Sequence, residues 1–152
     1  MFASVGSILS GTEKTSSTSW TSATTSAQLD SGNLGIVKLA LDNFATTNGV
    51  STLVSTVTLG GQTVNKISEY TRTSGAAADG VTTWMGYVIA SGNIASGATL
   101  AVTLANAVVA KAATGWEFTR DTAKNLVVRV PVTEGGGTSG QLTSLTLSGL
   151  TS

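Results

Sequence analysis

Carboxylates are the main side chains here that could do chemistry, because the 152 residues include no histidine and no cysteine. Without these two residue types, a Ser–His–Asp or Cys–His site, a disulfide and a thiolate metal site are all excluded. The remaining catalytic arrangement is a pair of acids about 5–10 Å apart, which can hydrolyse a glycosidic bond. The sequence has eight acids: Glu13, Asp30, Asp42, Glu69, Asp79, Glu117, Asp121 and Glu134.

Two of these acids, Glu69 and Glu117, lie in predicted strands beside aromatic residues. Tyr70 follows Glu69, and Trp116 and Phe118 flank Glu117. Most of the other acids neighbour Gly, Asn, Ser or Thr, where carboxylates act as turn formers. A two-carboxylate active site is one interpretation of the pair. The favoured interpretation places both acids on the outer faces of strands, solvated or ion-paired.

Signals for metals and phosphates are weak. Asp30–Asn33 and the Asp42-Asn43 pair could lend oxygens to a calcium ion between loops, although ordinary Asx-turns explain them better. The spacing of an EF-hand calcium loop does not occur. The glycines at 135–137 lack the Lys-Ser/Thr of a phosphate-binding loop. The sequence therefore predicts no catalytic, metal-binding or cofactor-binding residue, and no enzyme activity.

The aromatic residues support two interpretations. They could form a platform on which a sugar stacks, or they could pack in the core. Only 5% of the residues are aromatic, so a chain of this length is expected to need most of them inside. Core packing is therefore favoured for Trp20, Tyr70, Trp84, Tyr87 and Trp116.

Composition excludes some partners. Lysine plus arginine and aspartate plus glutamate each number 8, so the net charge is zero, and the basic residues are scattered. Phosphate neutralisation requires a basic excess or stripe, so nucleic acid is not an expected partner. No segment approaches the roughly 18 apolar residues of a membrane span. The first residues lack the positive start of a signal peptide, which predicts synthesis in the cytoplasm.

Apolar residues alternate with hydroxyl-bearing ones along much of the chain, which has 19 serines and 26 threonines. This period of two predicts strands, and Gly60-Gly61 predicts a tight turn that joins two of them in a hairpin. About eight or nine short strands with Gly-rich turns indicate an all-β, antiparallel sandwich of two sheets, or a barrel. The clearest runs are 34–41, 53–59, 64–71, 81–90, 100–104, 116–118, 126–130 and 145–147.

Residues 1–19 differ from the rest because they are rich in Ser and Thr and show little periodicity. We expect an extended N-terminal arm there, followed by a single β-sandwich domain over residues 20–152. The arm is either a frayed terminus or a segment that docks on a neighbouring subunit. Phe2, Ile8 and Leu9 favour docking slightly, because a solvated tail has little use for them.

Four segments together resemble a β-sandwich module that recurs in structural proteins of tailed bacteriophages. They are LDSGNLGIVKLALD at 29–42, QTVNKISEYT at 62–71, TWMGYVIASGNIA at 83–95 and KAATGWEFT at 111–119. The resemblance covers roughly residues 20–130, and the Trp-Glu-Phe strand is its most specific part.

This resemblance implies a jelly-roll-like fold and a place in the virion, where a small β-sandwich looks like a capsid decoration, or cement, protein. Such proteins bind between major capsid subunits and commonly form homo-oligomers, often trimers. The resemblance thus implies the major capsid protein and further copies of this chain as partners, with no nucleic acid or membrane involved. The alternative is a tail or fibre module that binds a glycan on the host surface.

Overall fold

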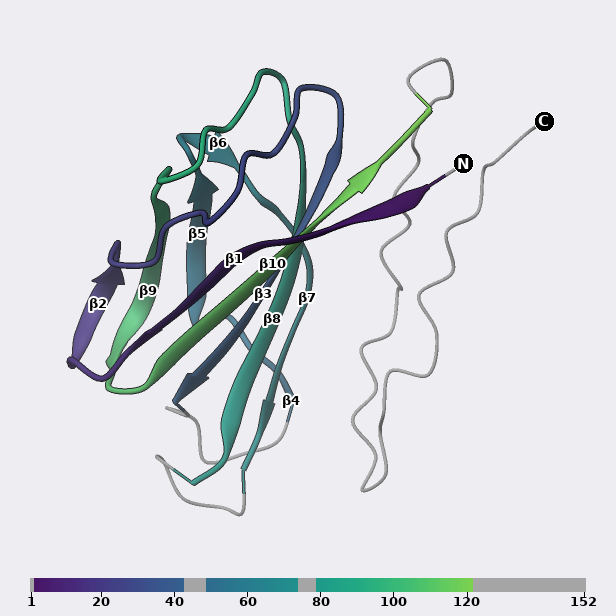
Figure 1. The fold of residues 1–152 in the computed structure, drawn as a ribbon. Helices are drawn as coiled ribbons and strands as arrows, with labels where there is room; N and C mark the ends of the chain where they lie inside the picture. Colours follow the sequence, from purple (N-terminus) through teal and green to yellow (C-terminus); the bar gives the residue numbers. More distant parts are fainter. Residues whose placement is uncertain (1, 43–48, 74–78, 122–152) are drawn as a thin grey trace.

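A computed structural model describes residues 2–42, 49–73 and 79–121, which form ten strands and no helix (Figure 1). Within these ranges no helix is long and apolar enough to cross a membrane. The strands predicted at 126–130 and 145–147 lie outside the described residues. The strands are β1 (Ala3–Glu13), β2 (Ser17–Trp20), β3 (Leu34–Asp42), β4 (Gly49–Val50), β5 (Val54–Leu59), β6 (Gln62–Thr63), β7 (Asn65–Arg72), β8 (Val81–Ile89), β9 (Leu100–Val108) and β10 (Lys111–Thr119).

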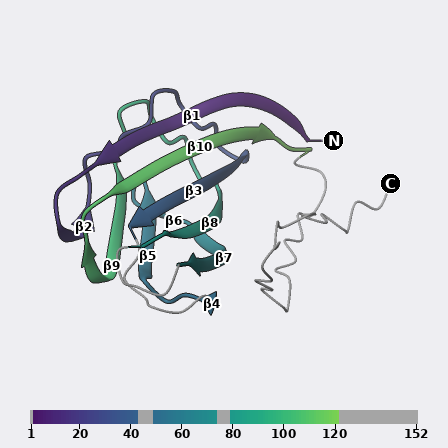
Figure 2. The same cartoon turned by 90° about the horizontal axis from the view of Figure 1, so that it is seen from below.

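The strands form two antiparallel sheets that face each other as two layers (Figure 2). The larger sheet has six strands in the order β1-β10-β3-β8-β7-β4, and the smaller has four in the order β2-β9-β5-β6. All pairings are antiparallel, as connections by short turns allow. The predicted all-β sandwich of two antiparallel sheets is confirmed.

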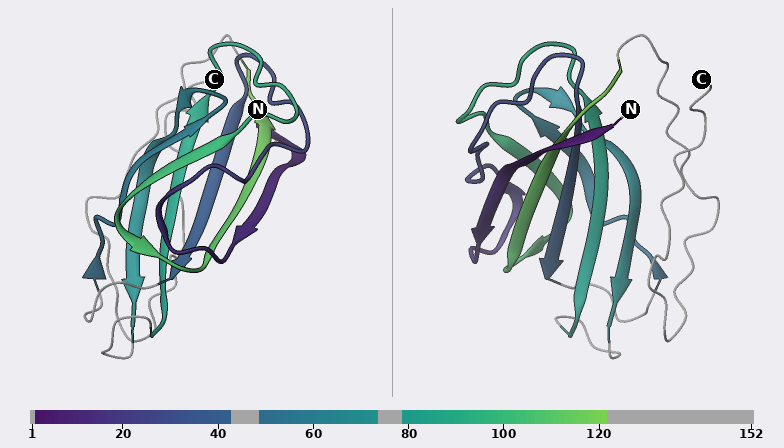
Figure 3. Two further views of the ribbon diagram at one scale, coloured as in Figure 1. Left: turned by 90° about the vertical axis from the view of Figure 1, so that its left-hand side faces the viewer. Right: turned by 45° about the vertical axis from the view of Figure 1, so that its right-hand side comes forward.

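The pairings are nested along the chain. β1 pairs with β10, β2 with β9, β3 with β8 and β5 with β6. Successive pairs go alternately to the large and the small sheet, except at the innermost pairs, where β7 also joins β8 in the large sheet. This wrapping of a long hairpin around two sheets is the jelly-roll arrangement. The first and last strands of the described residues, β1 and β10, therefore lie side by side (Figure 3).

Alternating side chains of both sheets fill the space between the layers. On β8 the inner face carries Thr82, Trp84, Gly86 and Val88, while the other face carries residues that are more exposed. Trp20 of the small sheet and Trp84 of the large one are 1% and 3% exposed. These inner faces form one hydrophobic core, whose burial is the main favourable contribution to folding.

Ala3–Glu13 and Ser17–Trp20 are strands of the sandwich, so the prediction of an extended arm over residues 1–19 is corrected. β1 is an edge strand of the large sheet and pairs with β10 from Ala3 to Glu13. Ile8 and Leu9 are buried in the core, at 1% and 0% exposure. The period-two pattern was obscured because the pairing of β1 shifts register twice, between Ser4 and Gly6 and between Ser7 and Leu9.

The predicted hairpin at Gly60-Gly61 is present but shorter than expected. Both glycines have positive φ, at 56° and 81°, as a tight turn between strands requires. β5 and β6 share only the pairs Thr58–Thr63 and Leu59–Gln62. The chain then passes Val64 into β7, which pairs with β8 in the other sheet. The predicted partner strand at 64–71 therefore corresponds to β7 in the other layer, and only Gln62 and Thr63 pair with β5.

Candidate functional site

Glu69 and Glu117 are buried, at 0% and 2% exposure, so the favoured prediction of an outer-face position, solvated or ion-paired, was wrong about the face for both, although Glu69 is ion-paired with Lys66. Glu117 lies on the inner face of β10 in line with Lys111, Ala113 and Gly115. Trp116 and Phe118 occupy the outer face instead and are only partly buried. The inner face of this strand carries small residues, which leave space for a long carboxylate side chain.

The Glu117 carboxylate holds a loop in place. Its Oε1 accepts hydrogen bonds from the backbone N–H of Asp30 at 3.0 Å and from Nδ2 of Asn33 at 2.7 Å. These two residues bound the turn that leads into β3, and the turn is further tied to Ala90 by two backbone hydrogen bonds. Glu117 thus supplies an acceptor for loop donors that lack a strand partner, which is a structural task.

The Glu69 carboxylate joins the two sheets. It lies on β7 of the large sheet, opposite Trp84, and its Oε1 accepts a hydrogen bond of 2.9 Å from the backbone N–H of Val54. Val54 begins β5 of the small sheet. The other oxygen lies 3.5 Å from Nζ of Lys66, whose side chain is 44% exposed. Buried acids are tolerated when they are paired and hydrogen-bonded in this way.

The two acids are too far apart to work as a catalytic pair. β7 and β10 are separated by β8 and β3, and three strand spacings of about 4.8 Å place them roughly 14 Å apart across the sheet. Glu117 is level with Val88 of β8 and Glu69 with Trp84, which adds a separation along the strands. A glycosidase pair needs about 5–10 Å. This arrangement rules out the Glu69–Glu117 active site.

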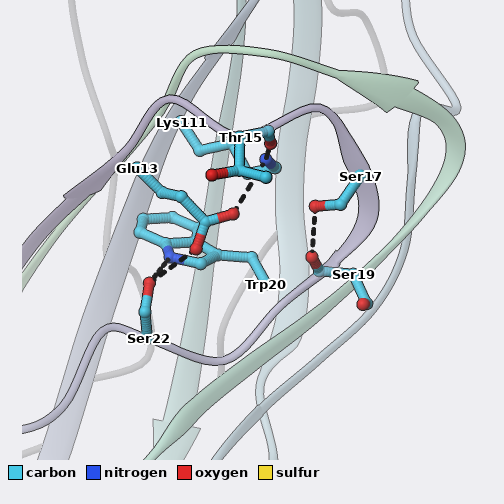
Figure 4. A network of polar contacts seen from close by, with 7 residues as sticks. All are labelled: Glu13, Thr15, Ser17, Ser19, Trp20, Ser22 and Lys111. Atoms are coloured by element: carbon cyan, nitrogen blue, oxygen red, sulfur yellow. Dashed lines mark hydrogen bonds and ion pairs between the residues drawn. The ribbon is translucent and has the colours of Figure 1, made fainter.

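A third buried ionisable group, which the sequence did not single out, organises the turn between β1 and β2 (Figure 4). The Lys111 side chain is 0% exposed and its Nζ donates to Oε1 of Glu13 at 3.2 Å and to the backbone carbonyl of Thr15. Oε2 of Glu13 accepts from Oγ of Ser22, which in turn accepts from Nε1 of Trp20. The network connects the end of β1, the turn and the segment after β2 to Lys111 at the start of β10.

This network shifts the titration of Glu13. The hydrogen bond from Ser22, followed by the hydrogen bond and charge of Lys111, lowers the pKa of the Glu13 carboxyl, and partial burial opposes this. Each of the four side chains bonds to another member of the network or to the turn backbone, so the network stabilises the turn. A sequence signal existed, because Lys111 lies on the same face of β10 as Ala113 and Gly115. The partner of Lys111 is Glu13, which is 98 residues away in the sequence and could not be identified without the fold.

The aspartates considered for calcium do not form a site. In the described ranges no three His, Cys, Asp or Glu residues gather in a way that could hold a metal ion. Asp30 accepts a hydrogen bond from Gln28, and its backbone carbonyl accepts one from the N–H of Asn33, which closes the turn. Asp42 ends β3 at the opposite end of that strand. The 30–33 loop is therefore a turn, but a backbone hydrogen bond closes it, and the Asp30 carboxylate bonds to Gln28 and not to a backbone N–H as an Asx-turn requires.

The aromatic residues divide between the core and one outer surface. Trp20 and Trp84 are core residues, as the favoured interpretation predicted. Tyr70, Tyr87 and Trp116 are only partly buried and lie on the outer face of the large sheet. Core packing is therefore right for two of the five and wrong for three.

The outer face of the large sheet carries an apolar row that crosses three strands. Trp116 of β10 is opposite Ile36 of β3, which is opposite Tyr87 of β8. Nζ of Lys38 lies 5.3 Å from the centre of the Trp116 ring, a cation–π contact that covers part of the ring. The outer face of an antiparallel sheet is usually polar, so this row distinguishes the surface.

Comparisons with models of protein families, with curated proteins and with solved structures found no match to this chain.

Proposed function

We propose that this chain is a virion structural protein, a capsid decoration subunit that binds between major capsid subunits and stabilises the shell. The observation that carries the proposal is the apolar outer row Trp116–Ile36–Tyr87, on a sandwich with only 11% charged residues. Such a face is suited to contact with another protein surface. The jelly-roll arrangement, which is common among capsid proteins, gives further support.

The buried polar groups also support the proposal. Glu69, Glu117 and Lys111 are the buried ionisable residues in the described ranges, and each fastens one chain segment to another. These side chains stabilise the fold, which is consistent with a protein that acts by binding another protein surface. A subunit that binds only the assembled shell stabilises it by mass action.

Copy number per particle tests this proposal. Quantitative mass spectrometry of purified particles is expected to find the chain in numbers comparable with the major capsid protein. A few copies per particle would favour the tail or fibre alternative instead. Complete absence from particles would overturn the virion setting itself.

A binding assay tests the surface. Particles that lack the chain are incubated with purified protein, and bound protein is measured after sedimentation. Ile36→Lys, at the centre of the apolar row, is expected to abolish binding. Thr56→Lys, at an exposed position of β5 in the small sheet, is the matched control and is expected to bind normally. Equal binding by both variants would show that another surface is used.

Deletion of residues 1–19, which the sequence predicts to be an arm that is frayed or docks on a neighbouring subunit, is not a clean test of binding. The deletion would remove Ile8 and Leu9 from the core and an edge strand from the large sheet. Loss of binding would then report loss of folding.

A further inference from the structure

A shallow depression of about 460 Å³ lies where the β5–β6 hairpin meets the end of β8, at the end of the sandwich where β6 is labelled (Figure 1). Its lining includes the polar residues Gln62, Thr63, Asn65 and Ser91 together with Tyr87. No charged residue lines it. An aromatic ring surrounded by amides and hydroxyls has both apolar and hydrogen-bonding groups to offer a ligand.

The rim of this depression is fixed by one side chain. Gln62 Nε2 donates to the carbonyl of Gly92 at 3.0 Å, and its Oε1 accepts from the N–H of Ser91 at 2.8 Å and from Ser91 Oγ at 3.0 Å. The hairpin and the loop after β8 are therefore tied together. A site held in shape before binding loses less entropy when the ligand arrives.

Two groups in the depression are available to a ligand. Asn65 and Tyr87 are direct cross-strand partners, so the amide and the ring lie side by side. Asn65 is exposed and Tyr87 is partly buried. Neither side chain has a hydrogen-bond partner in the part of the chain that the structure describes. The Trp116 ring, further along the row, is already in contact with Lys38.

We propose that this depression binds a neutral sugar. The apolar C–H face of a pyranose would lie on the Tyr87 ring, which offers a flat apolar surface and a polar hydroxyl at its edge. The Asn65 amide, with donors on one atom and an acceptor on the other, would contact two adjacent sugar hydroxyls. The absence of charge favours neutral over anionic sugars. The depression shares Tyr87 with the apolar row of the proposed function, but Gln62, Asn65 and Ser91 lie outside that row, so sugar binding and particle binding can be tested separately.

An NMR titration of the full ¹⁵N-labelled chain tests the site. The probes are the methyl glycosides of glucose, galactose, mannose and N-acetylglucosamine, with methyl glucuronide as the anionic comparator. At least one neutral probe is expected to produce saturable shifts at the Asn65 side-chain amide and the Tyr87 backbone amide. No saturable shift with any neutral probe, or tighter binding of the glucuronide, would overturn the proposal.

Substitutions then assign the contacts. Asn65→Ala is expected to raise the Kd roughly tenfold, because it removes the hydrogen bonds from the Asn65 amide to the sugar. Tyr87→Phe should bind nearly as well as the original chain, and Tyr87→Ala should show no saturable shift. Thr83→Ala, on the same face of β8, is the matched control. Far-UV circular dichroism verifies that each variant is folded, and an unchanged Kd for folded Asn65→Ala would contradict the assignment.

The two proposals fail separately. Asn65→Ala is expected to leave binding to particles unchanged, whereas Ile36→Lys is expected to abolish it. Loss of sugar binding with normal particle binding would therefore concern the depression alone.

Discussion

At the scale of single residues, buried charge in this protein is used where the backbone leaves a strand ladder. Glu117 accepts from the loop before β3, Glu69 from the first residue of β5, and Lys111 donates to the turn after β1. Each side chain satisfies backbone groups that have no strand partner at that point. An unsatisfied buried polar group costs about 1–3 kcal/mol, so these residues contribute to stability by removing that cost.

Glu117→Ala should therefore destabilise the fold by about 1–3 kcal/mol for each donor left without a partner, Asp30 N–H and Asn33 Nδ2. Glu117→Gln keeps one side-chain oxygen as acceptor and should cost clearly less. Urea unfolding followed by fluorescence measures both changes. Equal destabilisation by the two variants would show that the negative charge, and not the acceptor, is what the loop requires.

Glu13 gives the molecule a dependence on pH. Its pKa is lower in the folded chain than in an ordinary glutamate, so its contribution to stability is present above the usual glutamate range. As pH falls through the folded-state pKa, the carboxyl is protonated and the contribution is lost. The urea midpoint is expected to decrease with falling pH in this acid range, and less steeply in Glu13→Gln. Parallel pH profiles for the two proteins would contradict this assignment.

At the scale of elements, the sequence predicts the strands of the sandwich interior well. The runs 34–41 and 81–90 correspond to β3 and β8 almost residue for residue. Regular alternation explains this success, because it appears wherever a strand has one buried face. Alternation does not say which sheet receives a residue, so the change of sheet at Val64 was missed.

The inner and outer faces of β10 could not be assigned from the sequence for a related reason. Trp116 and Phe118 are larger and more apolar than Lys111, Ala113 and Glu117, and hydrophobicity alone favours placing the aromatics inside. The inner face includes the small residues Ala113 and Gly115, because side chains from neighbouring strands fill the space beside them. A Cβ on Gly115 would lie 3.0 Å from Cβ of Leu9, which arrives from β1.

The strand β1 should be essential to the fold, because its inner residues belong to the core. Leu9→Ala should destabilise the protein by about 2–5 kcal/mol, the range for removing a large buried aliphatic side chain. Val5→Ala on the same strand, where the side chain is 56% exposed, should change stability by less than about 0.5 kcal/mol. Chemical denaturation measures both. A small effect of Leu9→Ala would restore the interpretation of residues 1–19 as an arm.

The close packing of β8 supplies another test. Gly86 lies beneath the Trp84 ring, and a Cβ there would come within 2.2 Å of Trp84 Cη2 and 2.8 Å of the Asn65 carbonyl oxygen. Gly86→Ala should therefore destabilise the fold by about 1–3 kcal/mol through overpacking. Gly92→Ala, with no atom within 4 Å of its Cβ, is the control and should have a small effect. Comparable effects would show that the Trp84 ring moves aside without cost.

At the scale of the whole molecule, nested pairing makes the two sheets depend on each other. The chain enters the large sheet at β1, passes to the small sheet at β2 and returns to the large sheet at β3, and it does the same in reverse from β8 to β10. The outermost pair joins Ala3 to Thr119. Neither sheet is made of a continuous stretch of sequence. We therefore expect both sheets to form and to break in one cooperative step.

Native-state hydrogen exchange can test this cooperativity. Val37 lies on β3 between β10 and β8, and Val102 lies on β9 between β2 and β5, so each valine is at the centre of its sheet. Their amides are expected to exchange with the same free energy of opening, equal to the global free energy of unfolding. Amides near the start of edge strand β1, such as that of Ser4, should exchange at lower free energy. If Val102 exchanged at a distinctly lower free energy than Val37, the small sheet would open alone. The core tryptophans Trp20 and Trp84, one from each sheet, would then not bind the layers into a single unit.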